Sequence, residues 1–325
     1  MSSVDVIVPC YRYGHFLREC VESVLTQPMK NIRVLIIDDA SPDNTSEVAA
    51  DLAKQDARVN VLRHAVNKGN IATFNEGIEW ACADYFLLLS ADDYLLPGAL
   101  GRAAALMDNH PEVGFTFGKA ITLNEHETVE PSTMVEGTWR ILKGLEFIEL
   151  SGARNIVHAP TVVVRAELQK RLGGYRPELT HAGDMEMWLR FAAHASVGMT
   201  EAYQAVYRRH SGNMSLEYLG KSWLPDLQQR ADAFNIFFQT CSDALPNARQ
   251  LQRKLFRLLA CEAVSLASVA FNEGNMEESE SISEFAARIY PAVRGTLPWA
   301  KLAGKRRLNY KTWHALQPII ARIRK

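Results

Sequence analysis

The sequence predicts an α/β fold with a mainly parallel sheet, followed by an α-helical extension at the carboxyl-terminal end. In the first 90 residues, short runs rich in β-branched and other apolar residues alternate with segments of helical periodicity. Four strands alternating with three helices imply parallel strands and helices that cover both faces of the sheet. From about Leu216 onward the apolar residues recur at helical spacing, which predicts the extension.

The elements of this fold can be placed by residue number. Strands are expected at residues 4–8, 33–37, 59–63 and 85–89, with helices at 16–25, 45–54 and 71–82. In the mixed middle of the chain, strands are expected at 115–123 and 161–165 and a helix near 185–193. In the extension, a helix that contains Leu251, Leu255 and Leu259 is expected to turn at residues 272–275 into a second helix that ends near Tyr290.

Composition limits the class of the protein. A chain of 325 residues has room for one large α/β core and a smaller appendage, and its formal net charge of -1 indicates no nucleic-acid partner. The five cysteines form no CxxC pair and the amino terminus lacks a secretion signal, so we expect reduced thiols and a cytoplasmic protein. Purely apolar runs such as residues 86–89 are far shorter than the roughly 20 residues that span a bilayer, so any membrane contact should be peripheral.

Polar residues follow each of the first four expected strands, where a parallel sheet binds its ligands. These strand exits contain Pro9 and Tyr11, Asp38 and Asp39, Asn67 and Gly69, and Asp92 and Asp93. Two adjacent carboxylates after an apolar strand, such as Asp92 and Asp93, repel each other unless a cation or ligand holds them, and a magnesium or manganese diphosphate would supply that cation. The alternative is that each acidic pair forms a solvated turn that caps the next helix.

A dinucleotide-binding oxidoreductase would share the alternating strands and helices of this opening. Its phosphate-binding loop needs the glycine spacing GxGxxG at the first strand exit, so that the backbone can approach a pyrophosphate. Here the first exit reads PCYRYGHF. The sequence therefore argues against that class of enzyme.

Four segments that contain the strand exits read VIVPCYRYGHFLRECVESVLTQ, VLIIDDASPDNT, NKGN and LLLSADDYLLPGAL. In this order they resemble the family 2 inverting glycosyltransferases of the GT-A fold. The resemblance covers roughly residues 3 to 215 and implies a Rossmann-like catalytic domain. We therefore expect a GT-A domain at residues 1–215, with a nucleotide-sugar-binding half at 1–113 and an acceptor half at 114–215, and a helical extension at 216–325.

The resemblance also implies roles for residues at the strand exits. The nucleobase pocket would be lined by Pro9, Tyr11 and Asp39 and bordered by Asn67 and Gly69. Asp92 would meet the ribose, and Asp93 would bind the metal. The family often has another Asp where Ser90 stands, so this chain departs from the pattern there.

Two later segments, GDMEMWLRFA and YRRHSGNMS, extend the resemblance in the expected order. In the first, Asp184 matches the general base of the family, whereas Gly183 replaces another acid. The alternative role of Asp184 is to cap the following helix, and the two roles are compatible. In the second, His210 matches a histidine that reaches the diphosphate or the metal, and the alternative is a surface histidine. Nearby donors for phosphate oxygens are Arg208, Arg209, Asn213 and Ser215.

These roles imply a metal-dependent inverting glycosyltransferase. It would move a sugar from a nucleotide-sugar, expected to be a UDP-sugar, to a hydroxyl of a glycan or lipid-linked acceptor, as in bacterial surface polysaccharide synthesis. Mn²⁺ or Mg²⁺ would offset charge on the departing diphosphate, and a single base implies direct displacement. The alternative is a catalytically silent nucleotide-sugar-binding subunit of a larger assembly, which the departures at Gly183 and Ser90 keep open. The sequence predicts no oligomeric state.

The carboxyl-terminal tail carries charge of one sign. Residues 301–325 contain eight Lys and Arg residues and no Asp or Glu, interleaved with apolar residues such as Trp313. Because basic and apolar side chains together bind anionic bilayers, this tail predicts a peripheral contact with the inner face of the cell membrane. The alternative is a helix packed on the catalytic domain with its basic face in water.

Overall fold

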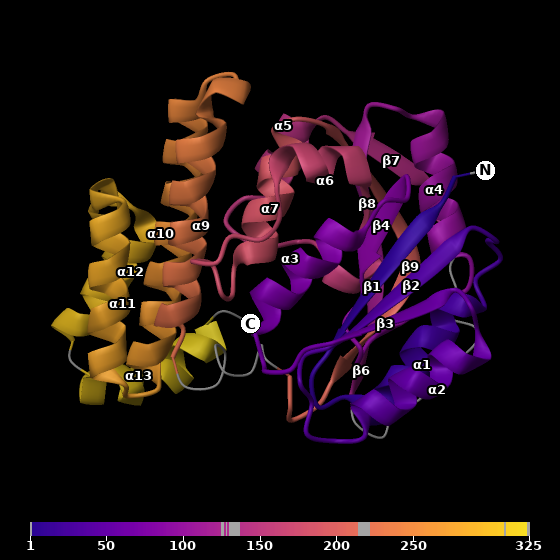
Figure 1. Cartoon of the computed structure of the whole chain (residues 1–325). Coiled ribbons are helices and arrows are strands. Elements are labelled where there is room, and N and C mark those ends of the chain that lie inside the picture. Colours follow the sequence, from indigo (N-terminus) through magenta and orange to yellow (C-terminus); the bar gives the residue numbers. More distant parts are fainter. Residues whose placement is uncertain are drawn as a thin grey trace. The chain divides into compact units, whose positions relative to one another are not determined.

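The computed structural model describes residues 2–124, 127, 129, 137–213, 222–308 and 310–323, and side chains as far as residue 316. The chain forms two compact units (Figure 1). The first comprises Met1–Ser151 and Asn155–Asn213, and the second comprises Gly152–Arg154 and Met214–Lys325. Ser215, one of the donors expected near His210, lies outside the described residues, as do residues 324 and 325 of the tail.

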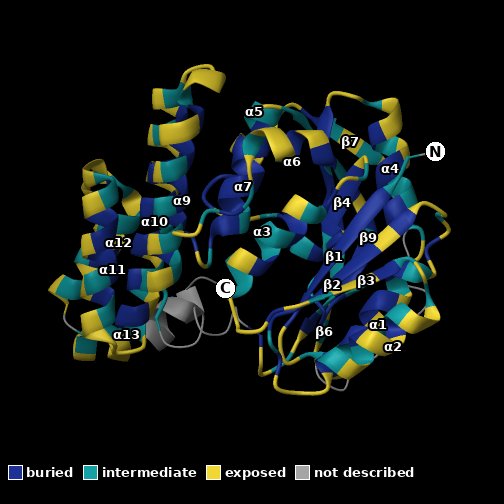
Figure 2. Cartoon of the chain, viewed as in Figure 1, coloured by how far each residue is buried: buried dark blue, intermediate teal, exposed yellow. Residues whose placement is uncertain are grey.

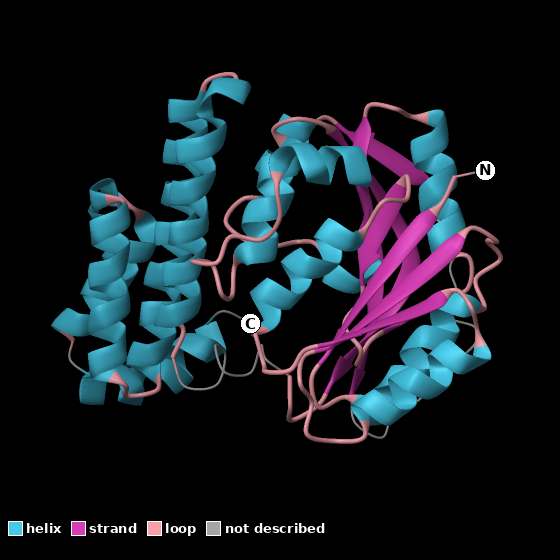
Figure 3. Ribbon diagram, viewed as in Figure 1, coloured by secondary structure: helices cyan, strands magenta, loops and turns pink. Residues whose placement is uncertain are grey.

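A nine-stranded sheet, counted over the described residues, forms the first unit in the order β3-β2-β1-β4-β8-β6-β9-β5, with β7 paired to β9 (Figure 3). The strands are β1 (Val4–Cys10), β2 (Ile32–Asp38), β3 (Val59–Arg63), β4 (Tyr85–Leu88), β5 (Tyr94–Leu95), β6 (Val113–Asn124), β7 (Trp139–Leu142), β8 (Val163–Arg165) and β9 (Ser196–Arg209). β1 to β4 pair in parallel, which confirms the expected parallel core. β8 runs antiparallel to β4 and β6, and β9 is parallel to β6 but antiparallel to β5 and β7.

The sequence pattern does not predict β5, β7 or β9, so the mixed half of the sheet departs from the expectation. β5 has two residues and β7 has four, which is too short for a period of two to be recognised. β9 has 14 residues, but its pairing with β6 shifts register at three places. Such irregularities break the alternation of apolar and polar residues that marks a strand.

Helices cover both faces of the sheet, so the central strands are buried on both sides (Figure 2). The helices of this unit are α1 (Gly14–Leu25), α2 (Thr45–Gln55), α3 (Asn70–Trp80), α4 (Ala99–Asn109), α5 (Gly144–Ser151), α6 (Ala166–Leu172) and α7 (Gly183–Ala192), with a short 3-10 helix, η2, at Ala159–Thr161. Alternate residues of β1, namely Val4, Val6 and Val8, share one apolar core with α1, α2 and α4. On the other face α3 lies so close to β1 that a Cβ atom at Gly77 would come within 2.3 Å of the Ile7 side chain.

An aromatic cluster fixes α7 against the mixed half of the sheet. The ring of Trp188, on α7, stacks on Phe115 of β6 with centroids 5.5 Å apart. Phe147 of α5 and Phe191 of α7 meet Phe115 edge-on at 5.5 and 6.3 Å. Because all four side chains are buried, Trp188 is a core residue that positions the helix carrying Asp184.

The second unit is helical, which confirms the expected extension. Its helices are α9 (Leu224–Cys241), α10 (Ala248–Asn272), α11 (Met276–Ile289), α12 (Leu297–Arg307) and α13 (Tyr310–Ile323), with short 3-10 helices η3 (Ser242–Ala244) and η4 (Pro291–Gly295). α10 packs against α9, α11, α12 and α13, and its residues Leu255, Leu259 and Ala263 are fully buried. In the described part of the chain, α10 is the one helix whose length and composition would allow it to cross a membrane, which a search for purely apolar runs does not detect.

The described part of the basic tail contacts its own unit. Nζ of Lys305 donates to Ser268 and Asn272 of α10, at 2.6 and 2.9 Å, and Nε1 of Trp313 donates to the same Asn272 at 2.8 Å. The guanidinium of Arg306 donates to the carbonyl oxygen of Ser279 of α11 at 2.9 Å. Part of the basic charge is therefore hydrogen-bonded within the helical unit.

Candidate active site

The carboxylate of Asp39, at the exit of β2, organises the loop that follows β3. Its Oδ1 accepts a hydrogen bond from the backbone N–H of Lys68 at 2.7 Å, and its Oδ2 accepts one from the N–H of Gly69 at 3.0 Å. The side-chain amide of Asn67 donates to the Asp39 carbonyl oxygen at 3.1 Å. Gly69 has φ of 83°, a left-handed conformation that favours glycine. The structure thus brings together Asp39, Asn67 and Gly69, three of the residues expected at a nucleobase pocket.

His64 completes this cluster, and the sequence pattern did not single it out. It is 5% exposed, and its Nδ1 lies 2.6 Å from Oδ1 of Asp39. Its Nε2 lies 3.0 Å from Oε2 of Glu76 on α3. That oxygen also accepts from Nζ of Lys68 at 2.8 Å, which lowers the pKa of Glu76. The sequence contains one indication that His64 belongs to the site. His64 directly follows the third strand, as Asp39 directly follows the second.

The exit of β1 lies beside the exit of β2. Pro9 is buried in the strand, whereas Tyr11 beyond it is 39% exposed. The backbone N–H of Arg12 donates to Oγ of Ser41 at 3.1 Å and ties the two exits together. Arg12 and Ala40 have φ of 64° and 58°, values that are uncommon outside glycine and that concentrate at functional sites. Of the two residues expected here, Tyr11 is the one whose side chain reaches solvent.

Asp92 and Asp93 occupy a tight turn between β4 and β5. The N–H of Asp93 donates to the carbonyl oxygen of Ser90 at 3.0 Å, so Ser90 shapes the turn through its backbone. The two acidic residues are 6% and 2% exposed. Burial raises the pKa of Asp92, although the hydrogen bond to His210 opposes the rise. Burial and the neighbouring charge of Asp92 raise the pKa of Asp93 well above its usual range, so the solvated-turn alternative does not describe this pair.

The carboxyl-terminal end of β9 places Arg208 beside Asp92 and Asp93. β5 begins directly after Asp93 and pairs antiparallel with β9, so the end of β9 lies beside the turn. The backbone N–H of Arg208 donates to Oδ1 of Asp93 at 3.0 Å, and its Nη1 donates to the carbonyl oxygen of Asp92 at 2.8 Å. The guanidinium lies over the rings of Phe16 and Tyr94, 4.9 and 4.7 Å from their centroids. These ring contacts hold a cation beside two buried carboxylates.

His210 and Asn213 contact the side chain of Asp92. Nε2 of His210 lies 3.2 Å from Oδ2 of Asp92, and Nδ2 of Asn213 donates to the same oxygen at 3.3 Å. The hydroxyl of Tyr13 donates to the carbonyl oxygen of Gly212 at 2.8 Å, and its ring meets His210 edge-on at 5.3 Å. The side chain of His210 is 10% exposed, so the alternative of a surface histidine is wrong.

Asp184 is half-buried in the first turn of α7. The N-cap position belongs to Ala182, which makes no side-chain capping bond. Oδ1 of Asp184 accepts from the N–H of Met185 at 2.7 Å, and Oδ2 accepts from Nδ2 of Asn155 at 2.8 Å. Burial raises the pKa of Asp184. Asp184 thus accepts a hydrogen bond from one free backbone amide of the first turn, although it is not the N-cap residue. The sequence pattern did not reveal its other partner, Asn155.

A buried ion pair anchors α7. Arg190 and Glu186 are 2% and 0% exposed and lie one turn apart, with Nε of Arg190 3.0 Å from Oε1 of Glu186. The same guanidinium donates to the carbonyl oxygens of residues 172–174 at 2.5, 2.9 and 2.8 Å. The amide of Asn75, on α3, bonds both the N–H and the carbonyl oxygen of Tyr175, at 2.8 and 3.0 Å. Asp184 therefore stands on a helix whose incoming loop is fixed at several points.

Apart from Pro9 and Tyr11 at the exit of β1, the expected site residues fall into two clusters and one separate side chain. The Asp39 cluster consists of Asp39, His64, Asn67, Lys68, Gly69 and Glu76. The Asp92 cluster consists of Asp92, Asp93, Arg208, His210 and Asn213. Asp184 bonds to neither cluster, and its own partners are Asn155 and Met185.

In the described part of the chain, no three or more His, Cys, Asp or Glu side chains form a ready-made metal site. In the Asp92 cluster the imidazole of His210 contacts Asp92, and the neighbouring residue Asp93 carries a second buried carboxylate. Magnesium sites commonly use one or two carboxylates and complete their coordination with substrate phosphates and water. Asp92 and Asp93 are carboxylates of the kind that such sites use.

Comparison with known proteins shows which family the chain resembles. Residues 5–159 match the family model described as Glycosyl transferase family 2. The segment of the chain that contains both acidic strand exits is therefore similar to glycosyl transferase family 2. A relative in this group, the uncharacterized glycosyltransferase EpsJ of Bacillus subtilis, is 38% identical over 92 residues, which are 28% of this chain and 26% of that protein. The aligned segment thus spans about a quarter of that relative.

Two solved structures share the fold of this chain. A crystal structure of S. aureus TarS 1-349 in complex with UDP-GlcNAc has a TM-score of 0.64 and 17% identity, and covers 98% of this chain and 92% of that one. The mannosyltransferase PcManGT from Pyrobaculum calidifontis, in complex with GDP-Man and Mn²⁺, has a TM-score of 0.54 and 15% identity, and covers 98% and 87%. The expected GT-A fold is confirmed.

Proposed function

We propose that the first unit moves a sugar from a nucleotide-sugar to an acceptor hydroxyl, with inversion at the anomeric carbon. The Asp92 cluster carries this proposal, because it holds two buried carboxylates with raised pKa at the carboxyl end of β4, beside Arg208 and His210 from β9. The match of residues 5–159 to the family 2 model supports the reaction class. The fold neighbours were crystallised with UDP-GlcNAc and with GDP-Man, which supports a nucleotide-sugar donor.

The donor base would bind at the exits of β1 and β2. Its pocket would be lined by Pro9, Tyr11 and Asp39 and bordered by Asn67 and Gly69. The half-exposed ring of Tyr11 offers a face for stacking, and the carboxylate of Asp39 is held by fixed backbone amides. Asp92 would meet the ribose. We expect a UDP-sugar, and the UDP-GlcNAc complex of the TarS neighbour supports that choice.

Asp93 and His210 would hold Mn²⁺ or Mg²⁺ together with oxygens of the donor. When bound, the cation would offset negative charge that develops on the departing diphosphate. Arg208 adds a permanent positive charge at the same turn, where its guanidinium donates to the carbonyl oxygen of Asp92 and also pairs with Glu19. The buried pair therefore has both a fixed and an exchangeable source of positive charge.

Asp184 would take the proton from the attacking acceptor hydroxyl. Burial raises its pKa, which makes it a stronger base than an exposed carboxylate. Asn155 orients one of its oxygens. A single base with direct attack inverts the anomeric centre, whereas retaining glycoside hydrolases use a second carboxylate as a nucleophile. Gly183 replaces the other acid of the family at a position where a Cβ atom would lie 3.3 Å from the ring of Tyr175.

The acceptor would be a glycan or a lipid-linked sugar, as in bacterial surface polysaccharide synthesis. We assign the donor to residues 1–113 and the acceptor to residues 114–215, which together approximate the first compact unit. Residues 216–325 form the extension. This division assigns Asp93 to the donor half and Asp184 to the acceptor half of one catalytic centre.

For the tail we propose a peripheral contact with an anionic membrane. Lys305 and Arg306 are bonded within the helical unit, so among the basic side chains that the structure describes the contact would rest on the exposed Lys301, Arg307 and Lys311. Replacing these three by Glu should release the protein from liposomes that contain anionic lipid, because each basic residue contributes about 1 kcal/mol near such a surface. Flotation of the variant with the liposomes, or no flotation of the wild-type chain, would contradict the proposal.

A donor screen tests the proposed reaction. The full chain would be incubated with individual UDP- and GDP-sugars, Mn²⁺ and a set of hydroxyl acceptors, and the released nucleotide measured. We expect turnover with one donor, an inverted anomeric configuration in the product, and loss of turnover when EDTA is added. Tight donor binding without turnover on any acceptor would favour the alternative of a silent nucleotide-sugar-binding subunit.

A further inference from the structure

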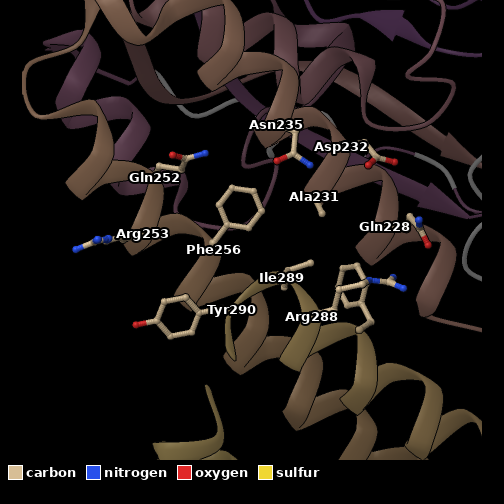
Figure 4. Close-up of a pocket in the computed structure, with 11 residues that line it drawn as sticks. Gln228, Ala231, Asp232, Asn235, Gln252, Arg253, Phe256, Arg288, Ile289 and Tyr290 are labelled. Carbon is tan, nitrogen blue, oxygen red and sulfur yellow. The ribbon is translucent and has the colours of Figure 1, made fainter. Parts of the chain in front are cut away.

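The helical unit contains a groove that the proposed reaction does not use. It has a volume of about 510 Å³ and lies between α9, α10 and α11 (Figure 4). Cavities of about 300 to 1,000 Å³ are typical of small-molecule sites. All of its lining residues belong to the second compact unit, so the groove exists within that unit alone.

Three polar side chains on this groove have no hydrogen bond to any described residue. They are Asp232 and Asn235 of α9 and Gln252 of α10. Asp232 and Gln252 are half-buried, and burial raises the pKa of Asp232 although Arg288 opposes the rise. A half-buried polar group without a protein partner retains hydrogen-bonding capacity for a ligand or for water.

The groove combines these polar groups with an apolar floor. Figure 4 shows the ring of Phe256 near the middle of the groove, with Asn235 and Gln252 above it and Ile289 below it. Arg288 adds a donor at its edge. The lining therefore includes a carboxylate that accepts hydrogen bonds, a guanidinium that donates them and amides that do both.

We propose that this groove binds a short segment of neutral oligosaccharide, such as part of the acceptor glycan. Sugar hydroxyls donate and accept hydrogen bonds, which matches the mixture of carboxylate, amide and guanidinium groups. The C–H face of a pyranose ring can pack on the apolar floor around Phe256. A lipid chain would leave the polar groups unpaired. The choice of a glycan rests on the proposed function.

The test is direct binding of tetrasaccharides to the full chain by isothermal titration calorimetry. The probes are cellotetraose, maltotetraose and N-acetylchitotetraose. We expect at least one to bind, and the double variant Asn235→Ala with Gln252→Ala to lower its affinity about tenfold or more, as the loss of two hydrogen bonds implies. The matched control replaces two exposed amides outside the groove on the same helices, Gln239→Ala with Gln250→Ala, and should keep wild-type affinity.

A second variant, Arg288→Gln, protects the test against misfolding, because it alters one exposed side chain at the groove edge. It should weaken the same tetrasaccharide while the melting temperature stays near that of the wild type. Unchanged affinity in both variants, or no binding of any tetrasaccharide by the wild type, would overturn the inference. Melting-temperature shifts with UDP and Mn²⁺ report on the first unit separately, so loss of that response would count against the proposed function and not against the groove.

Discussion

The Asp39 cluster and the Asp92 cluster both place carboxylates at the exits of parallel strands, but they balance these charges differently. The carboxylate of Asp39 accepts two backbone N–H bonds and faces His64, which also faces Glu76. In the Asp92 cluster two adjacent carboxylates are buried together, and burial raises the pKa of both. Protein groups alone thus complete the first cluster, whereas the second gains most from an added cation. We infer that the Asp39 cluster keeps its structure without a ligand and that the Asp92 cluster is the part of the site that depends on a ligand.

The substitution Asp93→Asn tests this difference between the two clusters and is expected to have the largest effect on donor binding. It removes a full charge from the proposed metal ligands, so the Mn²⁺-dependent part of donor binding should fall by about a hundredfold or more. Calorimetry with UDP, with and without Mn²⁺, measures it. Asp51→Asn, which alters an exposed carboxylate on α2, is the control and should bind as the wild type does. Equal metal dependence in Asp93→Asn and wild type would remove Asp93 from the metal site.

Asp184 lies outside both clusters, so its replacement should separate chemistry from donor binding. Asp184→Asn should lower kcat by about a hundredfold or more, the usual scale of general-base loss, and leave the donor Kd within about twofold. Steady-state kinetics and calorimetry on the same preparation give the two numbers. A parallel loss of donor affinity would make Asp184 a structural residue of α7.

A smaller effect on donor binding is expected when His64 is removed from the Asp39 cluster. His64→Ala removes the buried ring that contacts both Asp39 and Glu76 and should lower the free energy of unfolding by about 2 to 4 kcal/mol. Donor affinity should fall about tenfold, because Asp39 loses one of the contacts that fix it, but its dependence on Mn²⁺ should persist. Urea unfolding and calorimetry measure these changes. If His64→Ala abolished the metal dependence, the two clusters could not be treated as separate.

The smallest effect is a shift in pH dependence. Burial raises the pKa of Asp184, and the carboxylate form is the active base, so activity should be lost as pH falls through that raised pKa. The acid limb of kcat/KM should therefore lie above about pH 4, the usual value of an Asp side chain. Asn155→Ala removes a hydrogen bond that favours the carboxylate and should move the limb to higher pH. A limb that stays in place would show that another group controls it.

Much of the first unit could be predicted because its signals are local. The strands β1 to β4 read as short apolar runs, and each exit carries polar residues within a few positions of the strand end. The resemblance named Asp39, Asn67 and Gly69 separately, and the structure joins them by hydrogen bonds. Whether they bind a base stays a prediction, as do the roles of Asp93 and Asp184.

Other parts of the site depend on partners distant in the sequence. Asn155 meets Asp184 across 29 residues, and Arg208 meets Asp93 across 115 residues. No periodicity or turn signal encodes such pairs. The β5 to β9 pairing that creates the second contact involves a strand of two residues, which no pattern can reveal.

The sequence by itself determined the parallel core, the helical extension and the acidic residues at the strand exits, because burial on both faces and helical spacing leave periodic traces along the chain. The tertiary structure decided how the charges are balanced. It set His64 between two carboxylates and brought Arg208 and His210 to Asp92 and Asp93. The physical reason is that burial and the distance between charges set the pKa and the ligand preference of a carboxylate, and both are properties of the folded chain.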